Sequence, residues 1–248
     1  MTVTEALLLF SAGLASGVIN AIAGGGTFLT FGAMTLAGLP PIMANATSSI
    51  VQFPGYITSA LAYRDQIAKE WKAVAVLAAI SLAGSLAGAL WLLSLSNPSF
   101  RAMVPWLLIA ATALFAAGPW LKPKASGEHP PNSPKGNILQ FLTSIYGGFF
   151  GAGMGVMMLA SLSLATGGDY HRLNGIKNTL SIVIAAVAIL VFTAGGAISW
   201  LHAVVMLPGA GIGGWLGVWF ARRVPQPVMR ALVIAIGLGL AGYYFCKG

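Results

Sequence analysis

Residues 17–39 read GVINAIAGGGTFLTFGAMTLAGL, an apolar stretch that three consecutive glycines interrupt. The apolar segment around it, 6–39, is too long for one membrane-spanning helix of about 20 residues and too short for two. Segment 138–166 has the same character, because glycines break it at five positions between 147 and 155. Apolar segments that glycine breaks at corresponding places in two halves are typical of discontinuous helices around a binding site. We therefore expect a glycine-broken hairpin in each half, although glycine in apolar helices also serves close packing alone.

The rest of the chain is built from further apolar segments. Six have the length of a single span: 42–63, 71–95, 103–121, 173–194, 200–221 and 228–245. Hydrophobic residues make up 57% of the chain and charged residues only 7%, whereas a soluble domain carries about 25% charged residues. The composition excludes a soluble fold and predicts an all-α polytopic protein of the inner (plasma) membrane, with the lipid bilayer as its partner.

The positive charge fits a membrane protein better than a nucleic-acid-binding protein. The net charge is +8, but the 13 lysines and arginines lie singly between apolar runs and form no basic stripe. Basic loops held in the cytoplasm explain this distribution. Residues 1–10 contain no Lys or Arg, so they lack the basic region of a signal peptide and we expect the first segment to be retained.

The sequence repeats itself at a single constant offset, the one that brings Asn45 onto Asn174. This offset superimposes polar and special residues that are rare here, and these matches indicate an internal duplication. The matched pairs are Gly24 and Gly153, Gly26 and Gly155, Gly38 and Gly167, Asn45 and Asn174, Trp71 and Trp200, Gly84 and Gly213, Gly88 and Gly217, Pro98 and Pro227, Arg101 and Arg230, and Ala102 and Ala231.

The repeat divides the chain into a first membrane repeat at 1–121, a polar cytoplasmic linker at 122–136 and a second membrane repeat at 137–248. Basic residues lie mainly between the second and third segments of the first half, and beside different segments in the second half. This exchange favours inverted repeats, each a hairpin plus three spans, which makes ten helices and places both termini outside. Eight simple spans related by a parallel repeat remain the alternative.

Signals for an enzyme are weak, and we expect none, with no cofactor and no metal. The three histidines lack a second histidine at ligand spacing, and the five carboxylates lie at segment ends or in loops. A proton relay of carboxylates within the membrane is therefore not expected. The single cysteine, Cys246, excludes an internal disulfide and a dithiol relay.

The segment HRLNGIKN at 171–178 contains the most informative polar residues. Asn174 and Asn178 share one helix face, and Lys177 borders it. An ionisable residue inside a span is a functional candidate, and amide donors beside an ammonium suit a small oxyanion. The alternative is a lysine that reaches for the headgroups while the asparagines bridge helices.

The helix breaks add backbone N–H groups and the positive ends of helix dipoles to this cluster. Consecutive glycines also allow these N–H groups to converge on an anion. The predicted substrate-binding residues are Gly24, Gly25, Gly26, Thr27, Asn45, Ser49, Gly151, Gly153, Asn174, Lys177 and Asn178.

At these motifs the chain resembles the TauE/SafE sulfite exporter family, also called the TSUP transporters. The likeness rests on GVINAIAGGGTFLTFGAMTLAGLPPIMANATSS at 17–49, GGFFGAGMGV at 147–156 and HRLNGIKN at 171–178. It implies a transporter of a small sulfur-containing anion, such as sulfite, thiosulfate or an organosulfonate, that exports its substrate by alternating access. A homo-oligomer is compatible with this interpretation. A carrier or channel for another small solute, with structural roles for the Asn and Lys residues, remains the alternative.

Overall fold

The computed structural model describes residues 1–23, 25–117, 133–166, 170–221 and 226–247, and these residues form helices without any strand. The helices of the first half are α1 (Val3–Ala23), α2 (Thr27–Leu36), α3 (Pro41–Ala62), α4 (Arg64–Lys69), α5 (Trp71–Ser94) and α6 (Asn97–Ala117). Those of the second half are α7 (Pro134–Phe149), α8 (Met154–Thr166), α9 (Tyr170–Ala194), α10 (Trp200–Ala221) and α11 (Gln226–Lys247). The predicted all-α polytopic fold is confirmed.

The helix order follows the predicted repeat. The offset that brings Asn45 onto Asn174 also superimposes the first residue of α3 on that of α9, of α5 on that of α10, and of α6 on that of α11. Each of the two long apolar segments is a pair of helices, α1 with α2 and α7 with α8. The short polar helix α4 occupies the positions that correspond to the end of α9 and the loop after it in the second half. Residues 122–132 of the expected linker lie outside the described residues, and Pro134 already belongs to α7.

Glycines let helices of the two halves approach each other closely. A Cβ atom at Gly13 of α1 would lie 2.5 Å from the carbonyl oxygen of Met206 in α10, and one at Gly17 would collide with the carbonyl oxygen of Ala210. The packing of α5 on α7 is equivalent, since a Cβ at Gly84 would lie 2.8 Å from the carbonyl oxygen of Phe141. Small residues at such contacts allow the backbones to touch, which stabilises helix association in lipid.

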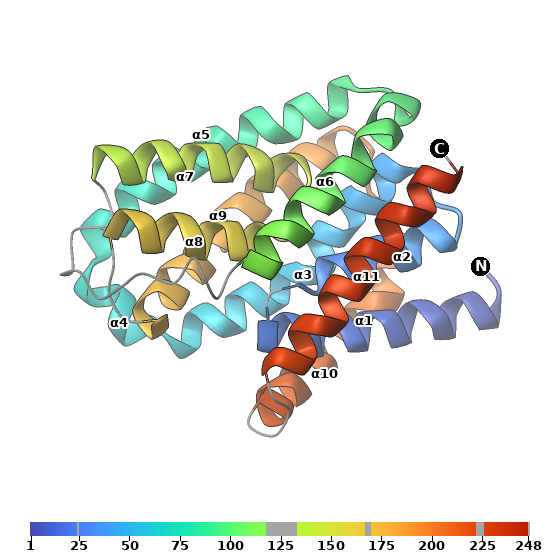
Figure 1. Ribbon diagram of the computed structural model, residues 1–248, viewed down its shortest axis with the longest axis horizontal. Helices are drawn as coiled ribbons and strands as arrows, with labels where there is room; N and C mark the ends of the chain where they lie inside the picture. The colour runs from blue at the N-terminus through green and yellow to red at the C-terminus, as the bar shows by residue number, and fades with distance from the viewer. Residues whose placement is uncertain (24, 118–132, 167–169, 222–225, 248) are drawn as a thin grey trace.

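The same contacts give the direction of each helix. Residues later in α1 contact residues later in α10, and residues later in α5 contact residues later in α7. The two helices of each pair therefore run parallel. Figure 1 shows α1 running away from the end that holds both termini, whereas α7 runs towards it. These two equivalent helices therefore point in opposite directions, as an inverted repeat requires. The inverted repeat as a whole and its orientation in a bilayer stay predictions.

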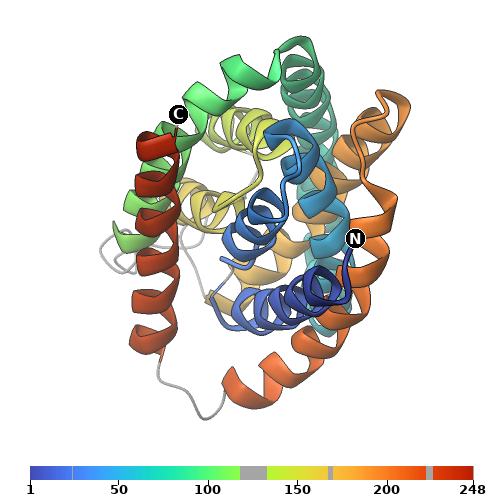
Figure 2. The ribbon, with the colours of Figure 1, turned by 90° about the vertical axis from the view of Figure 1, so that its right-hand side faces the viewer.

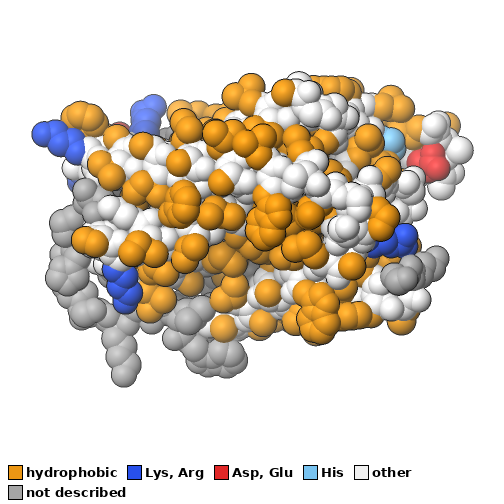
Figure 3. Space-filling view, turned by 90° about the horizontal axis from the view of Figure 1, so that it is seen from above, with side chains coloured by type: hydrophobic (Ala, Val, Ile, Leu, Met, Phe, Trp, Pro, Cys, Tyr) orange, Lys and Arg blue, Asp and Glu red, His pale blue; other side chains and the backbone are white. Residues whose placement is uncertain are grey.

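The surface matches insertion in lipid. Large apolar side chains such as Trp106, Leu190 and Trp215 are exposed, and Figure 3 shows apolar atoms along the length of the molecule with basic groups at the ends. Three described helical segments are long and apolar enough to cross a membrane on their own: Val3–Asn20, Trp71–Ser94 and Arg172–Ala194. Both termini lie at one end, which faces the viewer in Figure 2, and α4 lies at the other. We call the end with α4 the basic end, because Lys69 and the start of α5 with Lys72 are there.

Candidate functional site

Gly26, in the break between α1 and α2, is required by close packing rather than by unusual backbone angles. Gly24 lies outside the described residues. Gly26 has right-handed backbone angles, φ −58° and ψ −31°, and a Cβ there would collide with the backbone of Ser16. The carbonyl oxygen of Gly25 accepts a hydrogen bond from the N–H of Phe28 at 3.3 Å. The glycines therefore let the first turn of α2 fold back against α1.

A three-residue chain of hydrogen bonds holds this break. The Gln52 side-chain amide of α3 donates to the Ser16 hydroxyl at 2.5 Å, and that hydroxyl donates to the carbonyl oxygen of Gly26 at 2.8 Å. Both side chains are buried. Buried polar groups are costly unless they are paired. These two hydrogen bonds therefore fix the position of the break relative to α3.

The break between α7 and α8 needs glycine for its backbone angles. Gly151 and Gly153 have φ values of +72° and +76°, in the left-handed region that side chains disfavour. The Tyr146 hydroxyl donates to the carbonyl oxygen of Ala152 at 2.7 Å, and the Asn45 amide of α3 donates to that of Phe149 at 2.9 Å. Packing therefore requires Gly26 in the first break, whereas positive φ values require Gly151 and Gly153 in the second.

The breaks meet in a small cavity at the centre of the molecule. It has a volume of about 20 Å³, roughly the room of one water molecule. Thr27 after the first break, Ser49 on α3 and Gly151 in the second break line it, so three predicted site residues are brought together there. The complete lining is Thr27, Ser49, Gln52, Tyr56, Gly147, Gly151, Met154, Ile184 and Ala185.

A polar face of α9 packs towards α3. Asn174, Lys177, Asn178 and Ser181 are spaced i, i+3, i+4 and i+7 and therefore lie on one side of the helix. Lys177 is 8% exposed and Asn178 is 3% exposed. No described residue forms an ion pair or a hydrogen bond with the Lys177 ammonium, and the buried Ser181 hydroxyl has no partner either.

The repeat places a matching face on α3. The same offset superimposes Asn45, Ser48, Ser49 and Gln52 on those four residues of α9. The asparagines at the head of each face bridge helices, since Asn174 donates to the Tyr63 hydroxyl at 3.3 Å, as Asn45 does to Phe149. Helix bridging, which the sequence left as an alternative, therefore describes both of these asparagines. Lys177 is the charged member of the two faces.

A larger cavity of about 410 Å³ lies between α1, α3, α9 and α10. It contains one predicted site residue, Asn174, and its lining has no charged side chain among the described residues. The lining is Gly17, Asn20, Val51, Gln52, Pro54, Gly55, Thr58, Ser59, Tyr63, Asn174, Ala210, Gly211, Gly214 and Trp215. Val51 and Ala210 lie at the middle of their helices, and the other positions lie towards the basic end. Gln52 belongs to both cavities.

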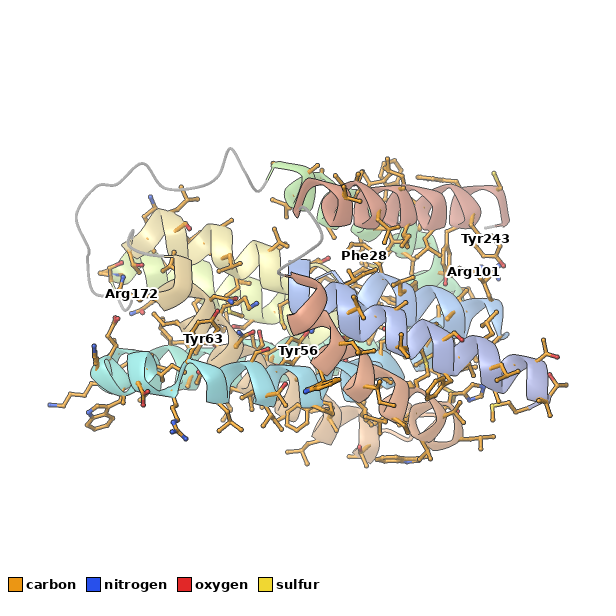
Figure 4. All side chains as sticks on the ribbon, turned by 90° about the horizontal axis from the view of Figure 1, so that it is seen from below. Phe28, Tyr56, Tyr63, Arg101, Arg172 and Tyr243 are labelled. Atoms are coloured by element: carbon orange, nitrogen blue, oxygen red, sulfur yellow. The ribbon has the colours of Figure 1, made fainter. Side chains whose placement is uncertain are left out.

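An ion pair joins the two halves near the mouth of this cavity. The Arg172 guanidinium of α9 donates to both carboxylate oxygens of Glu70, which precedes α5, at 2.5 and 2.7 Å. Figure 4 shows Arg172 near the basic end, with Tyr63 and then Tyr56 along α3 towards the centre. Bidentate pairs of this kind fix the relative orientation of the two side chains, in addition to their favourable energy.

The predicted site residues therefore do not all line one cavity. Lys177, Asn178, Asn45 and Gly153 line neither described cavity. Sequence reasoning missed Ser16, Gln52 and Ser181, although the i, i+3, i+4, i+7 spacing from Asn45 and Asn174 pointed to Gln52 and Ser181. Ser16 carried no comparable signal, because its role arises from the fold of the hairpin.

Comparison with known proteins agrees with this architecture. The profile of the sulfite exporter TauE/SafE family matches residues 9–244. The chain belongs to this family. No solved structure matches the chain.

Several bacterial membrane proteins are similar over nearly the whole length. A probable membrane transporter protein of Haemophilus influenzae is 25% identical over 227 residues, which are 92% of this chain and 89% of the relative. A probable membrane transporter protein of a Sinorhizobium species is 27% identical over 237 residues, 94% of this chain and 89% of the relative. A probable membrane transporter protein of Escherichia coli is 24% identical over 229 residues, 92% of this chain and 85% of the relative. The chain is thus a multi-pass member of a family of membrane transporters.

Proposed function

We propose that this member of the TauE/SafE family exports a small sulfur-containing anion, such as sulfite, thiosulfate or an organosulfonate, across the inner (plasma) membrane by alternating access. The observation that carries the proposal is the buried Lys177, which has no ion pair among the described residues. Removing a charge from water costs several kcal/mol unless a partner compensates for it. An anion that binds beside Lys177 supplies that partner.

The surroundings of Lys177 favour a small oxyanion over a bulkier charged ligand. Asn178 offers amide N–H groups on the next position, and the unpartnered Ser181 hydroxyl lies one turn further along α9. Hydrogen bonds between such donors and an ionised acceptor are short and strong. The first residues of α2 and α8, Thr27 and Met154, line the central cavity and add positive dipole ends there.

The two cavities favour access from the basic end in this conformation. The central cavity holds about one water, whereas the larger cavity lies in the half of the molecule towards α4. Positive residues favour the cytoplasm, so the conformation fits loading from inside the cell. Export of an anion from an inside-negative cell gains about 2.3 kcal/mol per charge per 100 mV, and it needs no carboxylate relay.

Thermal unfolding in detergent tests the anion site. The ligands are sulfite, thiosulfate, 2-hydroxyethanesulfonate, sulfate and chloride, and the variants are Lys177→Met and the control Lys72→Met at the exposed start of α5. A ligand at 100 times its Kd stabilises the folded state by about 2.7 kcal/mol. We expect one sulfur anion to stabilise the wild type and the Lys72→Met variant, and to leave Lys177→Met unchanged.

The ligand-free proteins give a second, independent measurement. Because an unpaired buried charge destabilises the fold, Lys177→Met should unfold at a higher temperature than the wild type when no anion is present. Equal ligand responses in Lys177→Met and the wild type would overturn the anion site. Efflux of the stabilising anion from proteoliposomes, driven by an imposed potential, then tests transport itself.

A second candidate function is a carrier for an uncharged polar solute. The observation that favours it is the neutral lining of the 410 Å³ cavity, in which amides from Asn20, Gln52 and Asn174 face hydroxyl groups and apolar walls. On this alternative Lys177 is structural. Transport that does not respond to an imposed membrane potential, with normal rates in Lys177→Met, would favour the uncharged solute.

A further inference from the structure

The Gln52 side chain lies between the two cavities. It is 3% exposed, and it lines both the large cavity towards the basic end and the small central cavity. A solute that moves from the first to the second cavity passes this side chain. Gln52 therefore lies at the boundary between the large cavity and the small central cavity on the path of the solute.

The hydrogen bonds of Ser16 determine which way the Gln52 amide faces. The Ser16 hydroxyl has one hydrogen, and it is donated to the carbonyl oxygen of Gly26 at 2.8 Å. The hydroxyl must then accept at its contact with Gln52, so the NH2 group of Gln52 faces Ser16 at 2.5 Å. The carbonyl oxygen of Gln52 points away from Ser16, and no described residue donates a hydrogen bond to it.

The other end of this chain of hydrogen bonds is the first turn of α2. The Gly26 carbonyl oxygen also accepts hydrogen bonds from the N–H groups of Leu29 at 3.0 Å and Thr30 at 3.3 Å. The next residue, Thr27, lines the small cavity together with Tyr56. A displacement of Gln52 therefore reaches the wall of the central cavity through Ser16 and Gly26.

We propose that Gln52 is a positioning residue that couples solute binding in the large cavity to opening of the helix break between α1 and α2, an inference that rests on the proposed transport. Its free carbonyl oxygen contacts an O–H or N–H group of the solute. When that contact draws the amide towards the solute, Ser16 loses its donor, and the first turn of α2 is released from α3. The solute that uses this contact carries a hydrogen-bond donor in addition to its anionic group.

Thiol labelling tests the mechanical link without any substrate. The background is Cys246→Ser with Thr27→Cys, which places one thiol in the wall of the small cavity. Gln52→Leu and Ser16→Ala each break the chain of hydrogen bonds and should increase the labelling rate several-fold. The matched control is Gln140→Leu, because Gln140 is 1% exposed, donates to Ser81 at 2.8 Å and to Ser144 at 3.1 Å, and lines neither described cavity.

Labelling that stays at the wild-type rate in both Gln52→Leu and Ser16→Ala would overturn the link. An equal increase in Gln140→Leu would overturn it too, since general loosening would then explain the result. Restoration of the slow rate by Gln52→Asn or Gln52→His, each of which can still offer an N–H donor, would support the specific hydrogen bond.

Two anions of equal charge and similar size test the contact with the solute. They are 2-hydroxyethanesulfonate, which carries an O–H group, and propane-1-sulfonate, which has a methyl group in its place. In proteoliposomes the wild type should prefer the hydroxylated anion by about tenfold in KM, the order expected for one buried hydrogen bond. Gln52→Leu should abolish the preference, whereas Ser16→Ala should keep it and change the maximal rate.

The outcomes separate this inference from the proposed function. If the wild type transports neither sulfonate nor any other tested sulfur anion, the proposed function fails, and the labelling rates still decide the link. If the wild type transports a sulfonate and Gln52→Leu behaves like Gln140→Leu in KM and maximal rate, the role of Gln52 fails while the proposed function stands.

Discussion

The Asn45 side chain donates a hydrogen bond to the carbonyl oxygen of Phe149, 2.9 Å away. The contact joins α3 of the first half to the end of α7 in the second half. Phe149 is the last residue of its helix, where carbonyl groups lack the partners that a continuing helix would supply. One asparagine therefore satisfies a buried carbonyl and fixes the break that follows it.

Loss of this hydrogen bond should destabilise the protein. We expect Asn45→Ala to lower the free energy of unfolding by about 1–3 kcal/mol, because the Phe149 carbonyl is left buried and unpaired. The control is Ser48→Ala, since among the described residues the Ser48 hydroxyl bonds only to the carbonyl of Ala44 in its own helix, at 2.8 Å. Thermal unfolding in detergent measures both variants. Equal midpoints for Asn45→Ala and the wild type would show that the contact contributes nothing.

The glycines of the second break should tolerate no side chain. Gly151→Ala forces a Cβ atom into a left-handed backbone, which costs about 1–2 kcal/mol. Gly239→Ala in α11 is the matched control, because a Cβ atom there would have no neighbouring atom within 4 Å and the φ of Gly239 is not positive. Alanine is the better helix former by about 0.5–1 kcal/mol. We thus expect opposite signs, with a lower unfolding midpoint for Gly151→Ala and an equal or higher one for Gly239→Ala.

Much of the fold could be predicted from the sequence because lipid imposes simple rules on it. Apolar segments of spanning length become helices, and the offset between Asn45 and Asn174 recurs between the helix starts of the two halves. Glycine breaks at 24–26 and 147–155 predicted the two hairpins. The short helix α4 was not predicted, since it belongs to a polar stretch and has no counterpart in the second half.

The candidate site was harder to predict, because tertiary contacts decide what each polar side chain does. The sequence grouped Asn45 with Lys177, but the fold turns Asn45 towards Phe149 and leaves Lys177 without a partner among the described residues. Gly26 and Gly153 belong to the two corresponding glycine motifs, yet one is needed for packing against Ser16 and the other for its positive φ. Periodicity shows which face of a helix is polar, and it does not show what that face meets.

The ion pair between Arg172 and Glu70 should contribute to the free energy of unfolding, unlike the pair of Arg64 and Asp65. Its side chains are only 15% and 23% exposed, whereas those of Arg64 and Asp65 are 77% and 94% exposed at a distance of 3.7 Å. A double-mutant cycle of Arg172→Gln and Glu70→Gln should give a coupling free energy of about 1–3 kcal/mol. The cycle of Arg64→Gln and Asp65→Asn should give about 0–1 kcal/mol, since water screens exposed pairs. Similar coupling in both cycles would mean that the bidentate geometry does not matter.

The topology of the membrane repeats can be tested with the single cysteine of the chain. Cys246 is exposed near the end that holds both termini, and we expect a membrane-impermeant maleimide to label it from outside intact cells. Lys135 is exposed in the first turn of α7, at the opposite end of the molecule. In a Cys246→Ser background, Lys135→Cys should be labelled only after the membrane is opened. An odd number of crossings in each half, from a hairpin that goes in and comes back and three full spans, produces this result.

The parallel alternative predicts a different pattern. Eight simple spans place four crossings in each half, so the start of the second half returns to the side of the termini, and both thiols would be labelled from the same side. A Lys69→Cys variant in the same background tests the topology again. With inverted repeats Lys69 lies opposite the termini at the basic end, whereas two simple spans before it would return it to the side of the termini. Labelling of the Lys69 and Lys135 variants from the side opposite to Cys246 supports inverted repeats. Labelling of Lys69→Cys, Lys135→Cys and Cys246 all from the same side would exclude them.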